Sequence, residues 1–370
     1  MEGDGTMPVV RRASTLPFVI CLMAMMIVIV GGTIRIHDAG ESCPDWPQCF
    51  GTWGFDISED EQAAYWAEHP DEIDSRGIDH RYTVFEIFTE WFHRFLVGVI
   101  ALPILFNVFL VHKKSEFYGS KTKNIAIASA ILLFVQAIAG MVTVEFDNED
   151  WTVALHLSLA SIFTALFIYQ FLIMRVKEGK KWKFLSLTDE NIRKVNHDVF
   201  RIVVAIGILL VLGAWVSSTS GGEYNKACSV GFPEGWPQCQ GDFLPSVTEN
   251  GELVPGVIIQ MIHRLGAAVV GIVLFVISSK MREYVQHEPN AKPISNMVEM
   301  TTGFWLLNVM IGGMYILFAK ADEFPELLSL LHLVVGVTVF LISITTLFMI
   351  QIAKEIQNDT ISSGDDNEQE

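Results

Sequence analysis

The apolar residues of this chain fall into long blocks that polar segments separate. Most blocks are about twenty residues long, which is the length of a helix that crosses a lipid bilayer. The pattern predicts eight transmembrane helices and therefore an all-α membrane protein. The predicted spans are 17–36, 84–112, 124–145, 152–174, 199–217, 257–279, 301–320 and 326–352.

The lysines and arginines of the polar segments indicate how the helices are oriented. They gather in the loops after the second, fourth and sixth predicted helices, whereas the intervening loops are acidic and poor in lysine. Cytoplasmic loops carry the excess of positive charge, so both termini are predicted to be cytoplasmic. We expect a multi-pass protein of the bacterial inner (cytoplasmic) membrane, with segments 37–83 and 218–256 as its long external loops.

Several motifs occur twice along the chain. Trp-Pro-Gln-Cys stands at 46–49 and again at 236–239, and the segment from Gln136 to Gly140 matches the segment from Asn308 to Gly312. Two sets of four helices enter the membrane from the same side, so we expect two parallel four-helix-bundle repeats. The predicted division is 1–177 for the N-terminal repeat, 178–198 for a cytoplasmic linker, 199–352 for the C-terminal repeat and 353–370 for an acidic cytoplasmic tail.

Composition agrees with a membrane protein and argues against a nucleic-acid partner. The 370 residues are 51% hydrophobic and 18% charged, with a mean hydropathy of +0.39. A soluble domain usually carries more charge. Much of the net charge of −17 lies in the loop 37–83 and in the tail 362–370, and no basic patch indicates nucleic acid.

Four of the ten histidines lie near the starts of the even-numbered predicted helices, all of which begin on the external side. A single histidine on an apolar helix is more often a packed residue than a ligand. Ionisable groups inside membrane spans are nevertheless costly and usually functional. Two matched pairs therefore predict two bis-imidazole sites near one membrane surface. The pairs are His93 with His156 and His263 with His332.

Haem iron is the most economical occupant of two such sites. Zinc and copper are alternatives, but two histidines without a nearby cysteine or carboxylate are a poor ligand set for structural zinc. Haem needs two axial imidazoles and a large apolar pocket, which a four-helix bundle provides. Arg94 and Arg264 each follow the first histidine of a pair and are positioned to bind haem propionates. Snorkelling of these arginines to the interface is the alternative.

The two halves differ at one position close to these histidines. Glu90 stands three residues before His93, on the same helical face, and Gln260 stands at the matching position before His263. A carboxylate at this depth is costly, and it can exchange protons with a bound ligand. We therefore expect the N-terminal half to be reactive and the C-terminal half to hold a permanent, electron-relaying group. A solvated glutamate at a helix start is the alternative.

Four of the five cysteines form two pairs in the external loops, Cys43 with Cys49 and Cys228 with Cys239. The external side of a bacterial membrane is oxidising, so disulfides are plausible there. Such disulfides would stabilise caps over the two sites, and one near a redox centre could also exchange electrons. A structural role is favoured for the second pair, and both roles stay open for the first. Cys21 is interpreted as a core residue.

Together these features resemble the haem A synthase family over nearly the entire chain. The specific matches are the motif Glu90-x-x-His93-Arg94, the three further histidines and both cysteine pairs. The resemblance implies an oxidoreductase acting on a CH group, which converts the C8 methyl group of haem O into a formyl group to make haem A for terminal oxidases. It implies that His93 and His156 hold the substrate haem, and that His263 and His332 hold a haem b cofactor. It also implies that Glu90 is needed for the chemistry and that the first cysteine pair assists it.

The resemblance further implies a set of partners. They are haem O synthase, the terminal oxidase assembly machinery, an electron acceptor that the sequence does not identify, and the lipid bilayer. A lateral opening between helices is expected, because the farnesyl tail of haem O belongs in lipid. The long acidic loop 37–83 departs from the family pattern, and both partner docking and simple solvation are open for it.

Other classes of protein compete with this interpretation. A di-haem cytochrome b that transfers electrons is the main alternative, but such proteins usually place their haems at different depths, whereas both sites here lie near one face. A transporter with parallel repeats leaves four matched histidines unexplained. A haem carrier differs from the enzyme only in having no need for Glu90.

Overall fold

The structure is a computed structural model that describes residues 12–74, 76–187, 189–216, 226–320 and 323–365. Within these residues, eight helices are long and apolar enough to cross a membrane, which confirms the predicted all-α multi-pass fold. They are α1 (Thr15–Ile36), α3 (Val84–Lys113), α4 (Ser115–Glu145), α5 (Asp150–Lys177), α6 (Asp189–Val216), α8 (Pro255–His287), α9 (Lys292–Leu317) and α10 (Glu326–Asp365).

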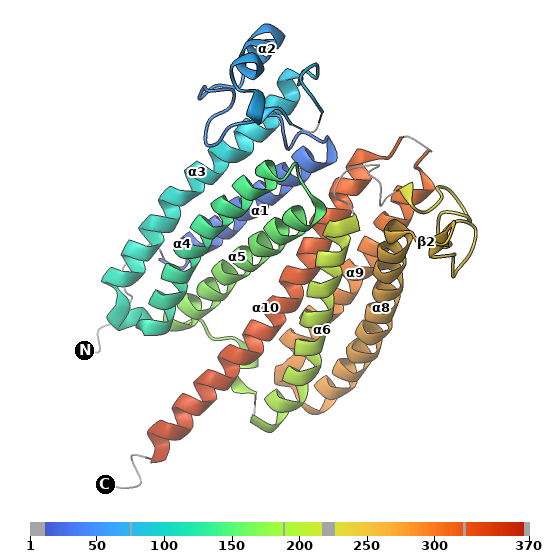
Figure 1. Cartoon of the computed structure of the whole chain (residues 1–370). Helices are drawn as coiled ribbons and strands as arrows, with labels where there is room; N and C mark the ends of the chain where they lie inside the picture. Colours follow the sequence, from blue (N-terminus) through green and yellow to red (C-terminus); the bar gives the residue numbers. More distant parts are fainter. Residues whose placement is uncertain (1–11, 75, 188, 217–225, 321–322, 366–370) are drawn as a thin grey trace.

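Shorter elements lie between the spans. They are the helix α2 (Glu59–Glu68), the 3-10 helices η1 (Pro70–Glu72), η2 (Lys183–Ser186) and η3 (Pro289–Ala291), and the antiparallel hairpin of β1 (Thr248–Glu249) and β2 (Glu252–Leu253). In Figure 1, α2 lies at one end of the bundle, and the described end of α10 lies at the opposite end.

The long helices pack as two groups of four (Figure 1). One group contains α1, α3, α4 and α5, and the other contains α6, α8, α9 and α10. The groups meet where α5 packs against α6 and α10, and where α1 packs against α10. The division into two domains stays a prediction. Part of the predicted linker 178–198 is helical, because α6 already begins at Asp189.

Two helix starts show how the local sequence sets the fold. At α3, the Thr83 hydroxyl accepts a hydrogen bond from the N–H of Glu86, whose carboxylate accepts the N–H of Thr83 at 2.7 Å. This capping box satisfies two N–H groups that would otherwise lack partners. At α4, Gly119 has a φ of +85°, which glycine adopts without a steric cost. The regular part of α4 therefore begins after Gly119, close to the predicted start.

The structure extends several helices beyond their predicted ends. α8 continues to His287, past the predicted end at 279, and α10 continues to Asp365, into the predicted tail 353–370. Hydropathy marks the part of a helix that lies in hydrocarbon, whereas the backbone hydrogen bonds continue into polar sequence. The last residues of that tail, 366–370, lie outside the described residues.

The long loop 37–83 is a folded cap. Its core contains the fully buried Trp66 together with Phe50 and Tyr82, and Gln62 ties it together by accepting the N–H of Tyr82 and donating to the Tyr82 carbonyl. Burial and the neighbouring Asp74 raise the pKa of the Tyr82 phenol, which therefore stays protonated and donates to that carboxylate. The acidic loop is thus ordered by its own apolar core and is more than a solvated connection.

Candidate functional site: one cavity with two histidine pairs

The structure brings the four predicted histidines to one cavity. The cavity has a volume of about 1130 Å³, and it is lined by His93 and His156 from one helix group and by His263 and His332 from the other. Sites for small molecules usually measure about 300–1,000 Å³. One continuous space is therefore large enough for bulky ligands and reaches both pairs.

Each histidine ring lies against a glycine of the preceding long helix. A Cβ built on any of these glycines would come closer to the Cε1 of its histidine than ordinary packing allows, so a larger residue would displace the imidazole. The contacts are Gly31 with His93 at 3.0 Å, Gly140 with His156 at 3.1 Å, Gly213 with His263 at 3.0 Å and Gly312 with His332 at 2.8 Å.

The two rings of the second pair are spaced as two imidazoles on one metal ion would be. The ring centroids of His263 and His332 are 6.4 Å apart, and the ring planes are inclined at 82°. Imidazoles bound on opposite sides of a metal ion, each with a bond of about 2 Å, have ring centres roughly 6 Å apart. His332 Nδ1 lies 3.0 Å from the carbonyl oxygen of Asn308, and donation there leaves Nε2 free to bind a metal.

The first pair is held differently. The side-chain amide of Gln136 donates to the backbone carbonyl of His156 at 3.0 Å and lies 3.2 and 3.3 Å from the two ring nitrogens. Gln136 and Asn308 are the first residues of the two matching motifs, so the same position contacts the second histidine of each pair. In the part of the chain that the structure describes, no group of three or more histidine, cysteine or acidic side chains could hold a metal ion. The histidine pairs therefore fit haem better than structural zinc.

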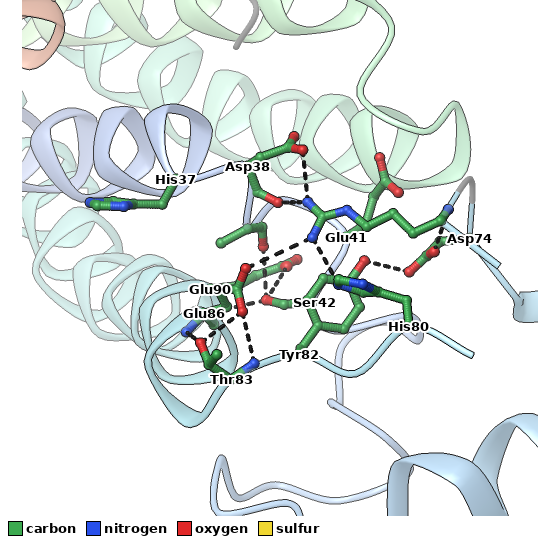
Figure 2. Close-up of polar contacts among 12 residues, drawn as sticks. His37, Asp38, Glu41, Ser42, Asp74, His80, Tyr82, Thr83, Glu86 and Glu90 are labelled. Atoms are coloured by element: carbon green, nitrogen blue, oxygen red, sulfur yellow. Dashed lines mark hydrogen bonds and ion pairs between the residues drawn. The ribbon is translucent and has the colours of Figure 1, made fainter. Parts of the chain in front are cut away.

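Glu90 is buried beside the first pair. Its side chain lines the cavity, and the residue is only 4% exposed. One carboxylate oxygen accepts hydrogen bonds from the Ser42 hydroxyl at 3.1 Å and from the N–H of Cys43 at 3.2 Å, and the other accepts from Arg94 at 2.6 Å. Figure 2 shows Glu90 pointing toward Ser42. The alternative of a solvated glutamate is therefore wrong.

Arg94 and Arg264 hold the two disulfide loops. Arg94 donates to the backbone carbonyls of Cys43 at 2.8 Å and Gln48 at 2.5 Å, and also to that of Asp45. Arg264 donates to the carbonyls of Gly235 and Gln238, both at 2.7 Å, and to the side chain of Gln260. Because these contacts are specific, simple snorkelling does not describe either side chain. Nη2 of Arg264 is buried and has no hydrogen-bond partner among the described residues.

The cysteines are paired as predicted. Cys43 is bonded to Cys49 and Cys228 to Cys239, and Cys21 is a free, buried residue. Since the N–H of Cys43 donates to Glu90, the first disulfide loop directly contacts the buried carboxylate. A redox role of the first disulfide stays a prediction.

The roles of one cavity-lining arginine and of one arginine in the segment 37–83 were not predicted from the sequence. Arg35, at the end of α1, lines the cavity and donates to the carbonyl of Asn148 at 3.1 Å. Arg76, in the segment 37–83, pairs with Asp38 at 2.9 Å and lies 3.0 Å from His80. Arg76 lies in a strongly acidic segment that looks solvated in the sequence. A single arginine at the end of an apolar block was the only signal for Arg35.

The fold and the cavity define a multi-pass helical membrane protein with two histidine pairs lining one internal cavity. Residues 14–357 match COX15-CtaA, the cytochrome oxidase assembly protein family. The chain belongs to this family.

Curated relatives agree with the resemblance seen in the motifs. The chain is 26% identical to the "Heme A synthase" of Geobacillus thermodenitrificans, over 72% of this chain and 71% of the relative. It is also 26% identical to that of Flavobacterium johnsoniae, over 90% of this chain and 96% of the relative. For the protein of the same name from Shewanella oneidensis, identity is 22% over 70% of this chain and 76% of the relative. These matches confirm the resemblance to the haem A synthase family.

Proposed function

We propose that the protein is a haem A synthase, an oxidoreductase that converts the C8 methyl group of haem O into a formyl group. The family and the curated relatives support this function. The structural observation that supports it most is the burial of Glu90, whose carboxylate lies in the half of the cavity that contains His93 and His156. The matching residue of the other half is the neutral Gln260.

In this proposal His93 and His156 hold the substrate haem, and His263 and His332 hold haem b. The glycine contacts at all four rings and the 6.4 Å separation in the second pair support a ligand role for these histidines. Glu90 beside the first pair supports the choice of that pair for the substrate. Haem b, when bound, supplies a one-electron redox centre. Arg264 is the better partner for a haem propionate, because its Nη2 is buried without a described partner whereas four N–H groups of Arg94 already donate to protein oxygens.

The residues around Glu90 define its role in the chemistry. Oxidation of a methyl to a formyl group, through an alcohol and a hydrated aldehyde, removes four electrons and four protons and takes one oxygen from water. We assign the acceptance of substrate protons, or stabilisation of the electron-poor carbon, to the Glu90 carboxylate. Ser42, Cys43 and Arg94 fix this carboxylate at the cavity wall. The four electrons pass to an electron acceptor of the cell.

The proposal places the protein in the bacterial inner membrane with both termini in the cytoplasm. Haem O synthase is then the donor of substrate, and the terminal oxidase assembly machinery receives the product. The alternation of positive charge among the loops supports this orientation.

The test is to identify the haems extracted from the purified protein and from two variants. Glu90→Gln should keep both haems but lower haem A production by about 10²–10⁴-fold, the usual contribution of a general acid or base. Glu86→Gln is the matched control. It removes the same charge one turn earlier on α3, and glutamine also serves in a capping box.

Each other outcome contradicts part of the proposal. Undiminished haem A in Glu90→Gln removes the role of Glu90. Two haem b groups per wild-type chain, with no haem O or haem A, favour the di-haem cytochrome. A protein that contains no haem favours the transporter.

A further inference from the structure

The cavity extends much further in the N-terminal half than in the C-terminal half. From His93 it continues between α3 and α4, whereas between α8 and α9 it reaches only a short way beyond His263. Its walls between α3 and α4 are Val97, Gly98, Ala101 and Leu102 on one side and Ala130, Leu133, Phe134 and Ala137 on the other. We call this space the α3–α4 groove. All of these residues are apolar, so the groove suits a hydrocarbon.

Trp305 closes the corresponding space in the C-terminal half. A Cβ built on Gly271 would lie 2.1 Å from Cη2 of Trp305, so the indole lies directly against the backbone of α8. Further along the same seam, the hydroxyl groups of Ser278 and Thr302 are buried and hydrogen-bonded at 2.7 Å. At these positions α8 and α9 are therefore in direct contact, and no ligand fits between them there.

The matching residues of the N-terminal half cannot close the groove in this way. Ala101 follows His93 as Gly271 follows His263, and Leu133 precedes Gln136 as Trp305 precedes Asn308. Leucine has no indole ring, and the Cβ of alanine would keep such a ring away from the helix backbone. The counterparts of Ser278 and Thr302 are Val108 and Ala130, whose side chains form no hydrogen bond.

The α3–α4 groove opens to the outer surface of the helix bundle. Phe95, Leu102 and Phe134 line the cavity and are also 51%, 70% and 68% exposed. A Cβ built on Gly98 would meet no described atom within 4 Å outside its own helix. Because apolar side chains on the outside of a membrane span face lipid, the groove connects the first histidine pair with the hydrocarbon of the bilayer.

We propose that the α3–α4 groove binds the farnesyl tail of the substrate haem and leads it into the bilayer, and that Trp305 excludes such a tail from the C-terminal site. This inference rests on the proposed function and gives its substrate site a determinant of specificity. It explains how two sites with the same ligand residues take different haems. A haem without a long tail suits the closed half, and a haem with one suits the open half.

The test compares the affinity of the N-terminal site for haem O and for haem b, measured by visible absorption on the full-length protein with its C-terminal site filled. Gly98→Phe places a ring in open space, so the fold should persist while the groove is filled. The matched control is Ala268→Phe, at the corresponding exposed position after His263. We expect Gly98→Phe to weaken haem O binding at least about tenfold, the loss of about two buried methylene groups, and to change haem b binding less than about twofold.

A second pair of changes tests the same inference in both directions. Ala101→Gly with Leu133→Trp copies the closed seam into the N-terminal half and should also weaken haem O binding selectively. Trp305→Leu opens the C-terminal half and should let haem O replace haem b there. Both results are read from the identity of the bound haem and not from turnover.

The outcomes separate this inference from the proposed function. If the wild type makes haem A while Gly98→Phe and the copied seam bind haem O normally, the groove assignment is overturned and the function stands. The groove assignment is also overturned, and the function stands, if Gly98→Phe releases a bound phospholipid and leaves haem O binding unchanged. A wild type that binds no haem O overturns both.

Discussion

The two halves of the cavity have the same framework of histidines, glycines and an arginine, and they differ in the residues beside that framework. In each half, glycines pack on the histidine rings, and an arginine ties a disulfide loop to the helix of the first histidine. The halves differ at Glu90 against Gln260 and at Leu133 against Trp305. In the function proposed above, a few positions beside a common ligand set distinguish the substrate site from the cofactor site.

The largest expected effect comes from removing one histidine in each half. His93→Ala should abolish binding of the substrate haem and leave one haem b per chain, whereas His263→Ala should abolish haem b, because a haem loses an axial bond in each case. Haem extraction and visible spectra distinguish the two. Loss of both haems in either variant would mean that the halves are not independent sites.

The glycine contacts provide the next test. Gly140→Val should displace the ring of His156 and weaken binding of the substrate haem by about ten- to a hundredfold. Gly312→Val should displace the ring of His332 and weaken binding of haem b by a similar factor. Gly303→Val is the control, since a Cβ there meets no described atom within 4 Å outside its own helix. Equal haem binding in all three variants would show that these contacts do not position the rings.

Removing each disulfide in turn should have a smaller effect that again differs between the two halves. Replacing Cys43 and Cys49 by serine, or Cys228 and Cys239 by serine, should each lower stability by about 2–4 kcal/mol in thermal unfolding. We expect only the first replacement to lower the rate of haem A formation beyond this effect, because the N–H of Cys43 donates to Glu90. If both replacements lower the rate equally, the first disulfide serves structure alone.

The smallest effect concerns the cap over the N-terminal half. Arg76→Gln should lower the free energy of unfolding by about 1 kcal/mol, because it removes the ion pair with Asp38. Amide hydrogen exchange within 37–83 should become faster for the same reason. Arg282→Gln, which breaks a largely exposed pair with Glu299, should change neither quantity. Unchanged exchange in Arg76→Gln would show that the apolar core of the cap is sufficient.

The features that depend on local pattern can be predicted from the amino-acid sequence. Apolar blocks of membrane length specify the helices, because the bilayer requires each span to satisfy its own backbone. Repeated motifs identified the four histidines and both cysteine pairs, and the structure joins the cysteines as predicted. Glu90 was distinguished by a single difference between the halves.

The contacts of those residues depend on how the helices and loops pack in three dimensions. Arg94 binds loop carbonyls that lie far from it in the chain, and Arg35 reaches the cavity from α1, because loop closure and helix packing set both arrangements. The fold of the acidic loop depends on Trp66 and Tyr82 meeting in one core. The difference between the open and closed seams follows from Trp305 lying on Gly271, and helix periodicity does not show which residues of two facing helices meet.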